Sequence, residues 1–337
     1  MKTNLSSLSY LKWFSLPVLA FVVIAIPLNL YFEPISGELT RIGHWSERDF
    51  GWQQPQPTVA VHANGTSITN PDVVVLGDSF THPNIWQSYL AESRNLNVLS
   101  FQYQDVACVD NWLHWVAERR YPNLHTVVIE TVERGFVPLF RNFNNCPRRT
   151  PKSFQLAENN VTPSRPQKGL TLDAGYLIPT ATNTLRAAWS DGSMVSGEVI
   201  NVPLSTDKLF SNRKANRLLY FADDELKRSW SDKDQAAAVA NLNRFQDNLA
   251  KKGLRLVVIV VPDKSSVYRP YLSNEASKVG YPDVFEQLKT AGVTNVNLLS
   301  YFQHAAGETV DLYLPNDTHL STQGYRLMAS KVADEAF

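Results

Sequence analysis

The sequence predicts an α/β fold in which one parallel sheet is covered by helices on both faces, preceded by a single transmembrane helix. Short runs rich in Val, Ile and Leu alternate with helical patterns along residues 71–335. Most of these runs are apolar throughout, which is typical of strands buried on both faces. Strand alternating with helix favours parallel pairing. A long uncharged segment near the N-terminus supplies the membrane helix.

The uncharged segment is WFSLPVLAFVVIAIPLNLYF, residues 13–32. As a helix it would span about 30 Å, the thickness of a bilayer's hydrocarbon core. Lys2 and Lys12 precede it and Glu33 follows, so the positive-inside rule predicts a cytoplasmic N-terminus and an extracytoplasmic remainder. A cleaved signal peptide and a buried core helix are the alternatives, but no small-x-small cleavage site follows Leu30. We expect a single-pass anchor in the inner membrane.

The chain divides into three regions. Residues 1–33 are predicted to form the cytoplasmic tip and the anchor, and residues 34–70, which are polar and contain prolines, a stalk or linker. Residues 71–337 are predicted to form one catalytic domain. Within it, residues 141–230 are rich in Arg, Asn, Pro, Ser and Thr and have weak periodicity. We interpret them as an insertion over the strand ends, where open α/β sheets bind ligands.

Strands are predicted where the apolar runs lie, at Asp72–Leu76, Leu96–Phe101, Thr126–Ile129, Leu254–Val261 and Val293–Leu299. Residues 235–252 and 321–335 carry apolar side chains at spacings of three and four, which predicts helices. Gly253 is a candidate cap at the end of the first helix, and Ser321 is a candidate cap at the start of the second.

Composition excludes some functions. The formal net charge is zero, so a nucleic-acid partner is not expected. The chain has no Gly-rich phosphate loop and no His pair at helical spacing, so we expect no cofactor and no metal.

The two cysteines of the chain, Cys108 and Cys146, could form one disulfide outside the cytoplasm. Two unpaired, buried thiols are an equally good interpretation.

Ser79 is the candidate nucleophile. The segment VVVLGDSFTHPN, residues 73–84, places it directly after the first predicted strand, on the turn into a helix. There a hydroxyl can point into the cleft, and backbone N–H groups, including that of Ser79, can stabilise an oxyanion. A helix cap is the alternative role for such a serine.

Its candidate partners lie near the C-terminus, in LYLPNDTHLSTQGY, residues 312–325. His319 would be the base, and Asp317, two residues earlier, would accept a hydrogen bond from its second ring nitrogen. In a doubly wound sheet the first and last strand–helix loops open on the same edge, so Ser79 and His319 can meet. The alternatives are a surface histidine and a helix-start carboxylate.

Together these motifs resemble the SGNH (GDSL-like) hydrolase superfamily, and within it the alginate O-acetyltransferase branch, the AlgJ/AlgX type. That branch has a D-x-H pair, which D-T-H at 317–319 follows. VVIETVERGF (127–136) and VVPDKSSVY (260–268) resemble two further stretches of the branch. The resemblance implies a flavodoxin-like three-layer sandwich.

The chain departs from that branch in several places. D-T-H follows the serine motif instead of preceding it, and Leu320 stands where a tryptophan is common. The superfamily's Gly and Asn oxyanion donors are not recognisable, so the donor that would assist the Ser79 N–H is unknown. Arg134 is a candidate donor or a clamp on an anionic glycan, with structural pairing to Glu130 or Glu133 as the alternative. Lys264 is expected to be solvated.

The resemblance and the anchor imply a periplasmic O-acyltransferase, acetyl being the expected group, that modifies an exopolysaccharide or envelope glycan. Ser79 would carry the acyl group, which a membrane-bound O-acyltransferase would supply. His319 would move the proton, and Asp317 would orient His319. The alternatives are an SGNH carbohydrate acetyl esterase and a catalytically silent subunit that binds glycan or scaffolds an envelope complex.

Overall fold

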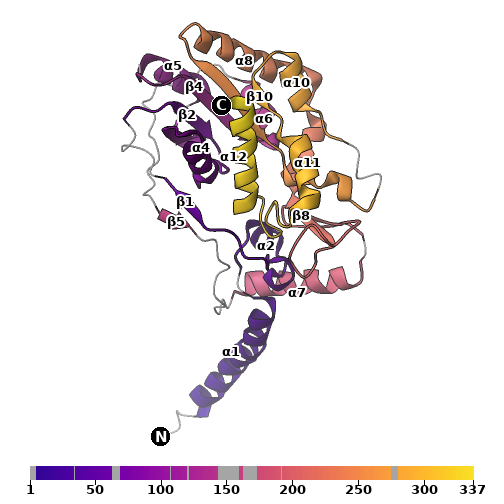
Figure 1. Cartoon of the computed structure of the whole chain (residues 1–337). Coiled ribbons are helices and arrows are strands. Elements are labelled where there is room, and N and C mark those ends of the chain that lie inside the picture. The colour runs from indigo at the N-terminus through magenta and orange to yellow at the C-terminus, as the bar shows by residue number, and fades with distance from the viewer. Residues whose placement is uncertain are drawn as a thin grey trace.

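The computed structural model describes residues 5–33, 35–62, 69–106, 108–119, 121–142, 159–161, 173–190, 192–274 and 280–337. A long helix, α1 (Leu5–Phe32), projects from an α/β domain (Figure 1). The domain is built on a five-stranded parallel sheet in the order β3-β2-β4-β9-β10. By their place in the chain these strands follow the order 2-1-3-4-5, which is the flavodoxin-like arrangement. The predicted fold class is confirmed.

The five strands correspond to the five predicted apolar runs. They are β2 (Val73–Gly77), β3 (Val98–Gln102), β4 (Thr126–Val132), β9 (Arg255–Val261) and β10 (Asn295–Val296). The last strand is shorter than predicted, because the Asn297 side chain accepts the N–H of Leu299 and starts a helix there. Local capping therefore ended this strand although the apolar run continues.

Helices cover both faces of the sheet, as predicted. One face packs against α4 (Ile85–Arg94), α11 (Leu298–Glu308) and α12 (Thr322–Ala336). The other packs against α5 (Val109–Arg119), α6 (Phe136–Phe140), α8 (Asp232–Ala250) and α10 (Val284–Thr290). Within β2, Val73 and Val75 join the first core, and Val74 and Leu76 join the second. This alternation explains why the strand has no polar face.

The two predicted helices form close to their expected limits. Residues 235–252 lie in α8 and its end, where Gly253 adopts the left-handed conformation with φ +75°. Residues 321–335 correspond to α12, whose N-cap is Ser321; its hydroxyl accepts the N–H of Gly324 at 3.1 Å. The Ser321 cap fixes the point at which the loop carrying Asp317 and His319 enters α12.

Helix α1 contains a 24-residue stretch, Ser9–Phe32, that is long and apolar enough to cross a membrane. Length and composition alone support this, and a signal sequence has the same properties. Pro17 and Pro27 lie inside the helix without ending it. Near its end, Ala25, Asn29 and Phe32 are buried against the domain.

The structure differs from the stalk predicted at residues 34–70. Helices α2 (Glu38–Gly43) and α3 (Glu47–Phe50) lie within residues 35–50, here called the amino-terminal clamp. Leu39, Trp45 and Phe50 are buried and form a small core of their own with the insertion. Because these three large apolar side chains pack against the insertion, this segment is part of the domain.

The insertion predicted at 141–230 contains α7 (Ala174–Ala188) and an antiparallel sheet. The strands of that sheet are β6 (Met194–Ser196), β7 (Val199–Pro203) and β8 (Arg217–Phe221). A short strand, β5 (Asn159–Val161), pairs with β1 (Val59–Val61). The insertion contacts the segment that follows β9, as in the bridge between Leu204 and Leu272. It thus lies at the carboxyl end of the main sheet.

Candidate active site

Ser79 lies on the turn between β2 and α4, and its side chain is exposed. The preceding Asp78 holds this turn in place. Its carboxylate accepts the N–H of Phe80 at 2.9 Å and the N–H of Val132, at the end of β4, at 2.7 Å. Phe80 is fully buried. The hydroxyl of Ser79 is therefore presented at the sheet edge by a turn that is fixed on both sides.

The tertiary structure brings the three predicted residues into one hydrogen-bonded chain. Nε2 of His319 lies 2.8 Å from Oγ of Ser79, and Nδ1 of His319 lies 2.7 Å from Oδ1 of Asp317. The Phe80 ring packs against the imidazole, with 4.9 Å between ring centroids. When Nδ1 carries the proton, Nε2 is free to accept the serine proton, which is the arrangement that a serine nucleophile requires.

A fourth residue, which the sequence did not indicate, contacts this chain. The backbone N–H of Glu38 in the amino-terminal clamp donates to Oδ2 of Asp317 at 3.1 Å. The Glu38 carboxylate accepts the Thr318 hydroxyl at 2.8 Å and lies 3.9 Å from Nδ1 of His319. Glu38 lies at the start of a helix in the segment predicted to be a linker, and its sequence context does not indicate this role. The contact joins positions that are 279 residues apart in the chain.

The electrostatics of the pair suit a general base. Burial disfavours the charged imidazole, but the hydrogen bond and charge of Asp317, with a smaller contribution from Glu38, outweigh it and raise the pKa of His319. Burial likewise opposes the charge on Asp317, yet its hydrogen bond to His319 and the charge of His319 hold the pKa of this carboxyl below its ordinary value. Asp317 therefore stays ionised and stabilises the imidazolium that forms when His319 accepts a proton.

Residues 216–336 match the family model described as SGNH hydrolase-like domain, acetyltransferase AlgX. The chain has an SGNH-like domain. The matched part contains β9, β10 and the Asp317–His319 loop, whereas Ser79 lies before it. No match was found among the curated proteins. The predicted resemblance is confirmed, and the catalytic roles of the three residues stay predictions.

The amino-terminal clamp also holds the loop of the SGNH-like domain that carries Asp317. The carbonyl of Asn316 accepts the N–H of Leu39 at 3.0 Å, and its side-chain amide donates to Glu47 at 2.6 Å. Glu47 is buried and also accepts the hydroxyls of Ser36 and Thr40, both at 2.5 Å. These bonds connect the segment that follows α1 directly to the Asp317–His319 loop.

Lys264 supports the same loop from the other side, contrary to the expectation that it is solvated. It is 2% exposed, and its ammonium donates to the carbonyls of Leu314, Pro315 and Asp317 at 2.7, 3.0 and 3.1 Å. Burial lowers the pKa of Lys264 to about 7. Three donor hydrogens exist only on the ammonium form, so these bonds favour the charged state against burial. The P-x-K segment is thus part of the site's framework.

Behind the serine turn lies a buried pair of carboxyl groups, Asp78 and Glu130. Glu130 is fully buried and accepts the Thr81 hydroxyl at 2.8 Å and the Asp78 N–H at 3.1 Å. Burial and the adjacent Asp78 raise the pKa of Glu130 well above its ordinary value, and burial also raises the pKa of Asp78. A protonated Glu130 avoids two adjacent buried charges. A Cβ on Gly77 would lie 2.4 Å from Glu130, so this turn requires glycine.

Arg134 is bound to buried carboxylates of the domain. Its Nη1 donates to Asp263 at 2.5 Å and to Asp224 at 3.3 Å, and its side chain is 21% exposed. Burial opposes its charge, but these two carboxylates outweigh burial and raise its pKa. Arg134 is therefore paired with carboxylates of the domain, as the alternative interpretation predicted, but its partners are Asp263 and Asp224 in place of Glu130 or Glu133. A role in substrate binding stays a prediction.

Lys227 completes this buried network. Its ammonium donates to Glu133 at 2.8 Å, Asp263 at 2.6 Å and the Ser266 hydroxyl at 2.8 Å. Glu133 from segment 127–136 and Asp263 from segment 260–268 are thus both paired with Lys227, and Asp263 is also paired with Arg134. Their arrangement joins the end of β4 to the start of α9 (Lys264–Val267).

Gln102, which sequence reasoning did not select, lies at the sheet edge near the serine turn. Gln102 ends β3, in register with Gly77 of β2. Its Nε2 contacts Nδ1 of His82, and its Oε1 accepts from Gln104 at 2.5 Å. The expected donor in this stretch was a glycine, which the sequence lacks, so Gln102 was not predicted. The Ser79 N–H as oxyanion donor stays a prediction.

Two remaining predictions concern cysteines and metals. Cys108 is disulfide-bonded, whereas Cys146, its predicted partner, lies outside the described residues.

Glu38, Asp317 and His319 bring ligand atoms within 4.8 Å of one another, a spacing that could hold a cation. A cation bound at Nδ1 of His319 would replace the bond between this nitrogen and Asp317.

Proposed function

We propose that this protein is a membrane-anchored, periplasmic O-acyltransferase that modifies hydroxyls of an exopolysaccharide or envelope glycan. The observation that carries the proposal is the hydrogen-bonded chain from Ser79 through His319 to Asp317, with 2.8 and 2.7 Å between the bonded atoms. The match to the AlgX acetyltransferase model favours acetyl as the group transferred. The apolar helix α1 supports the anchor.

The reaction has two halves. Oγ of Ser79 attacks the carbonyl of the acyl donor while Nε2 of His319 takes its proton, and this proton then passes to the leaving group. In the second half a sugar hydroxyl gives its proton to His319 and attacks the acyl-serine, which returns Ser79 with its proton. Asp317 keeps the His319 ring oriented throughout. The acyl donor is supplied by a membrane-bound O-acyltransferase.

We propose Gln102 as the second oxyanion donor, beside the N–H of Ser79. Its place at the end of β3, next to the serine turn, supports this assignment. Removal of one oxyanion donor typically lowers kcat by about 10²–10³. We expect Gln102→Leu to show a loss of this order, while a fluorophosphonate still labels Ser79 but does so more slowly.

The test uses the full chain in detergent, incubated with p-nitrophenyl acetate and a mixture of oligosaccharides. Mass spectrometry follows acetyl on Ser79, acetyl on sugar and free acetate, with Ser79→Ala as the control. Acetylated sugar that disappears in the variant supports the transferase. Free acetate alone identifies an esterase, since the three residues serve water and sugar hydroxyls equally.

A catalytically silent subunit that binds glycan is the remaining alternative. The bonded Ser79, His319 and Asp317 argue against it, because no member of the set is missing or turned away. If wild type and Ser79→Ala are equally inert and a fluorophosphonate does not label Ser79, the enzyme proposal is wrong.

A further inference from the structure

Helix α7 of the insertion exposes an apolar stripe. Ile178, Leu185 and Trp189 have exposed fractions of 63%, 59% and 86%. Ile178, the exposed Thr182 and Leu185 are separated by four and three residues, so they lie along one face of the helix, and Trp189 follows as its C-cap, four residues after Leu185. Large apolar side chains at such exposure, in one row, mark a surface that meets an apolar partner.

The opposite face of α7 is fixed to the domain, so the stripe cannot turn inward. Tyr176 and Asn183 are buried there. The Tyr176 hydroxyl donates to the carbonyl of Trp45 at 3.1 Å, and the Asn183 amide donates to the carbonyl of His44 at 3.1 Å and to the Ser196 hydroxyl at 2.6 Å. These bonds set the rotation of α7 about its own axis.

The position of α7 identifies the partner. Tyr176 and Leu177 form a buried cluster with Ala25 and Phe32 of α1. Both of these α1 residues belong to the stretch Ser9–Phe32 that can cross a membrane. At about 1.5 Å per residue, Ala25 lies roughly 10 Å inside the end of this stretch. Figure 1 shows α7 lying across the foot of the domain, where α1 leaves it. A helix at this depth meets the interfacial layer of the bilayer.

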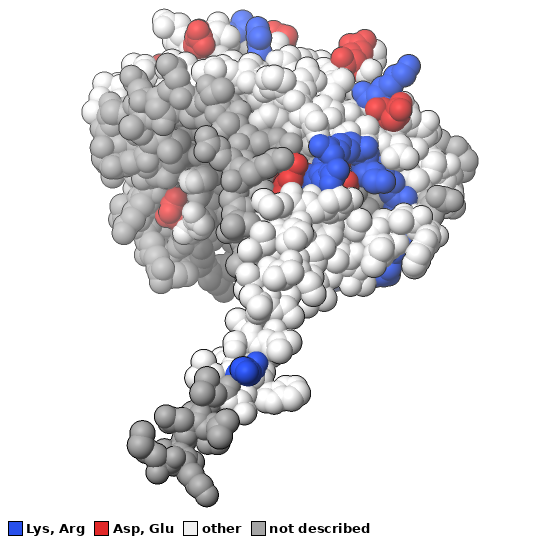
Figure 2. Space-filling model, turned by 90° about the horizontal axis from the view of Figure 1, so that it is seen from below, with Lys and Arg blue, Asp and Glu red and all other residues white. Residues whose placement is uncertain are grey.

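Basic side chains lie at the same foot of the domain. The Arg48 guanidinium sits 4.1 Å from the ring centroid of Tyr31, near the end of α1. The backbone N–H of Lys214 donates to the carbonyl of Asp49, the residue after Arg48, at 3.1 Å, and Arg213 and Lys214 are exposed. Seen from below, Lys and Arg side chains gather beside the base of α1 (Figure 2). Such side chains attract anionic headgroups.

We propose that α7 is an interfacial helix, and that its stripe of Ile178, Leu185 and Trp189 inserts into the surface of a bilayer containing anionic phospholipid. This inference rests on the anchoring part of the proposed function. It adds a second membrane contact, which restricts rotation of the domain about α1. Asn183 of α7 also bonds the carbonyl of Gly43 in the amino-terminal clamp, at 3.2 Å. The active site is thereby held at a set height above the membrane that delivers the acyl donor.

The experiment places an environment-sensitive nitrobenzoxadiazole label on Leu185→Cys, and separately on Ile178→Cys, in the full chain. The chain is reconstituted in vesicles of phosphatidylcholine and phosphatidylglycerol. Arg186→Cys, one residue away on the helix, and the remote, exposed Glu308→Cys are matched controls. The wild-type chain, carried through the same labelling, is the blank for native cysteines. Quenching by lipids with a doxyl group near the headgroup measures contact with the bilayer.

We expect blue-shifted emission and strong doxyl quenching at positions 178 and 185, weaker quenching at 186 and none at 308. A blue shift without doxyl quenching would mean that a protein covers the stripe, and the proposal would be wrong. Carbonate extraction distinguishes the failure of the interfacial helix from the failure of the membrane anchor. If the chain stays in the membrane but the label at position 185 is as little quenched as the label at position 308, the interfacial helix is refuted and the anchor stands. A chain that is extracted refutes both, whereas the acyl-transfer assay in detergent is unaffected.

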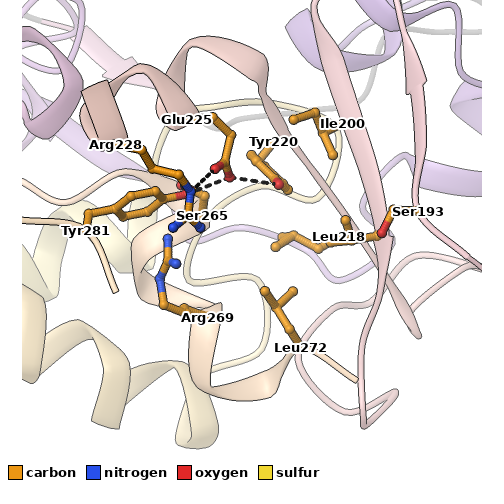
Figure 3. A pocket seen from close by; sticks show the side chains of 11 residues that line it. Ser193, Ile200, Leu218, Tyr220, Glu225, Arg228, Ser265, Arg269, Leu272 and Tyr281 are labelled. Atoms are coloured by element: carbon orange, nitrogen blue, oxygen red, sulfur yellow. Dashed lines mark hydrogen bonds and ion pairs between the residues drawn. The ribbon is translucent and has the colours of Figure 1, made fainter. Parts of the chain in front are cut away.

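The domain also contains a pocket beside its small sheet. It has a volume of about 250 Å³ and lies between the small sheet and the segment after β9, with Arg228 and Arg269 near the Tyr281 ring (Figure 3). Glu225 bonds Arg228 at 2.6 Å and the Tyr281 hydroxyl at 2.7 Å, so the polar groups here partner one another. No ligand chemistry follows from this pocket.

Discussion

The backbone N–H of Glu38 donates a hydrogen bond to Oδ2 of Asp317 over 3.1 Å, while Oδ1 of the same carboxylate holds His319. One carboxylate therefore connects α2, the helix that follows α1, to the candidate base. Since the Glu38 side chain also lies 3.9 Å from Nδ1 of His319, this residue positions and tunes the base without touching Ser79.

Glu38→Gln keeps the backbone donor but removes the charge. Because the Glu38 charge helps to raise the pKa of His319, the variant should have a lower one. The base acts when neutral, so the acid limb of the pH–rate profile should move to lower pH, and at pH 6 the variant should retain a larger fraction of its maximum than wild type. Esterase assays with p-nitrophenyl acetate across pH measure this. The exposed Glu335→Gln is the control, and an unmoved profile in Glu38→Gln would contradict the role.

Asp317→Asn tests the orientation of the base. Asparagine can present its amide N–H to Nδ1 and favour the tautomer that leaves no acceptor for the Ser79 proton. We expect kcat to fall roughly 10³–10⁴-fold, as it does in Ser–His–Asp enzymes. Thr318→Val loses the bond to Glu38 and the longer contact, 3.4 Å, with Nδ1 of His319, but keeps the bond between His319 and Asp317, so it should cost far less. Equal losses in the two variants would show that loop structure, and not the His319 tautomer, limits activity.

Gly37→Ala should separate the amino-terminal clamp from the loop it holds. A Cβ at this position would lie 2.1 Å from the carbonyl oxygen of Asn316, so α2 must move away and carry the Glu38 N–H with it. We expect a lower kcat, with KM for p-nitrophenyl acetate little changed. Gly280→Ala, where a Cβ meets nothing within 4 Å, is the matched control. Full activity in Gly37→Ala would mean that the clamp does not support catalysis.

Lys264→Met removes the ammonium that satisfies three carbonyls of the Asp317 loop. Unpaired buried polar groups are costly, so we expect the free energy of unfolding to fall by about 3 kcal/mol. Denaturant unfolding of the full chain in detergent measures this, with the exposed Lys252→Met as control. A loss no larger than that of the control would show that the loop holds its conformation without Lys264.

Much of the sheet could be predicted because each strand is buried on both faces, and an unbroken apolar run such as VVVLG records that burial directly. The meeting of Ser79 and His319 could be predicted for a related reason. Loops that follow parallel strands open on one edge, whatever their separation in the chain. The Ser321 cap could be predicted because its bond to Gly324 is local.

The partners of these residues were decided only by the tertiary structure. The amino-terminal clamp has short helices and scattered apolar residues, and Leu39, Trp45 and Phe50 gain a core only when the insertion folds against them. Lys264 and Arg134 have the residue types of solvated or substrate-binding groups, and their burial depends on carbonyls and carboxylates brought from distant segments. The sequence by itself determined the fold class and the placement of Ser79, Asp317 and His319, because these follow from local burial patterns and strand order. The support given by Glu38 and Lys264 depended on three-dimensional contacts, which no local pattern encodes.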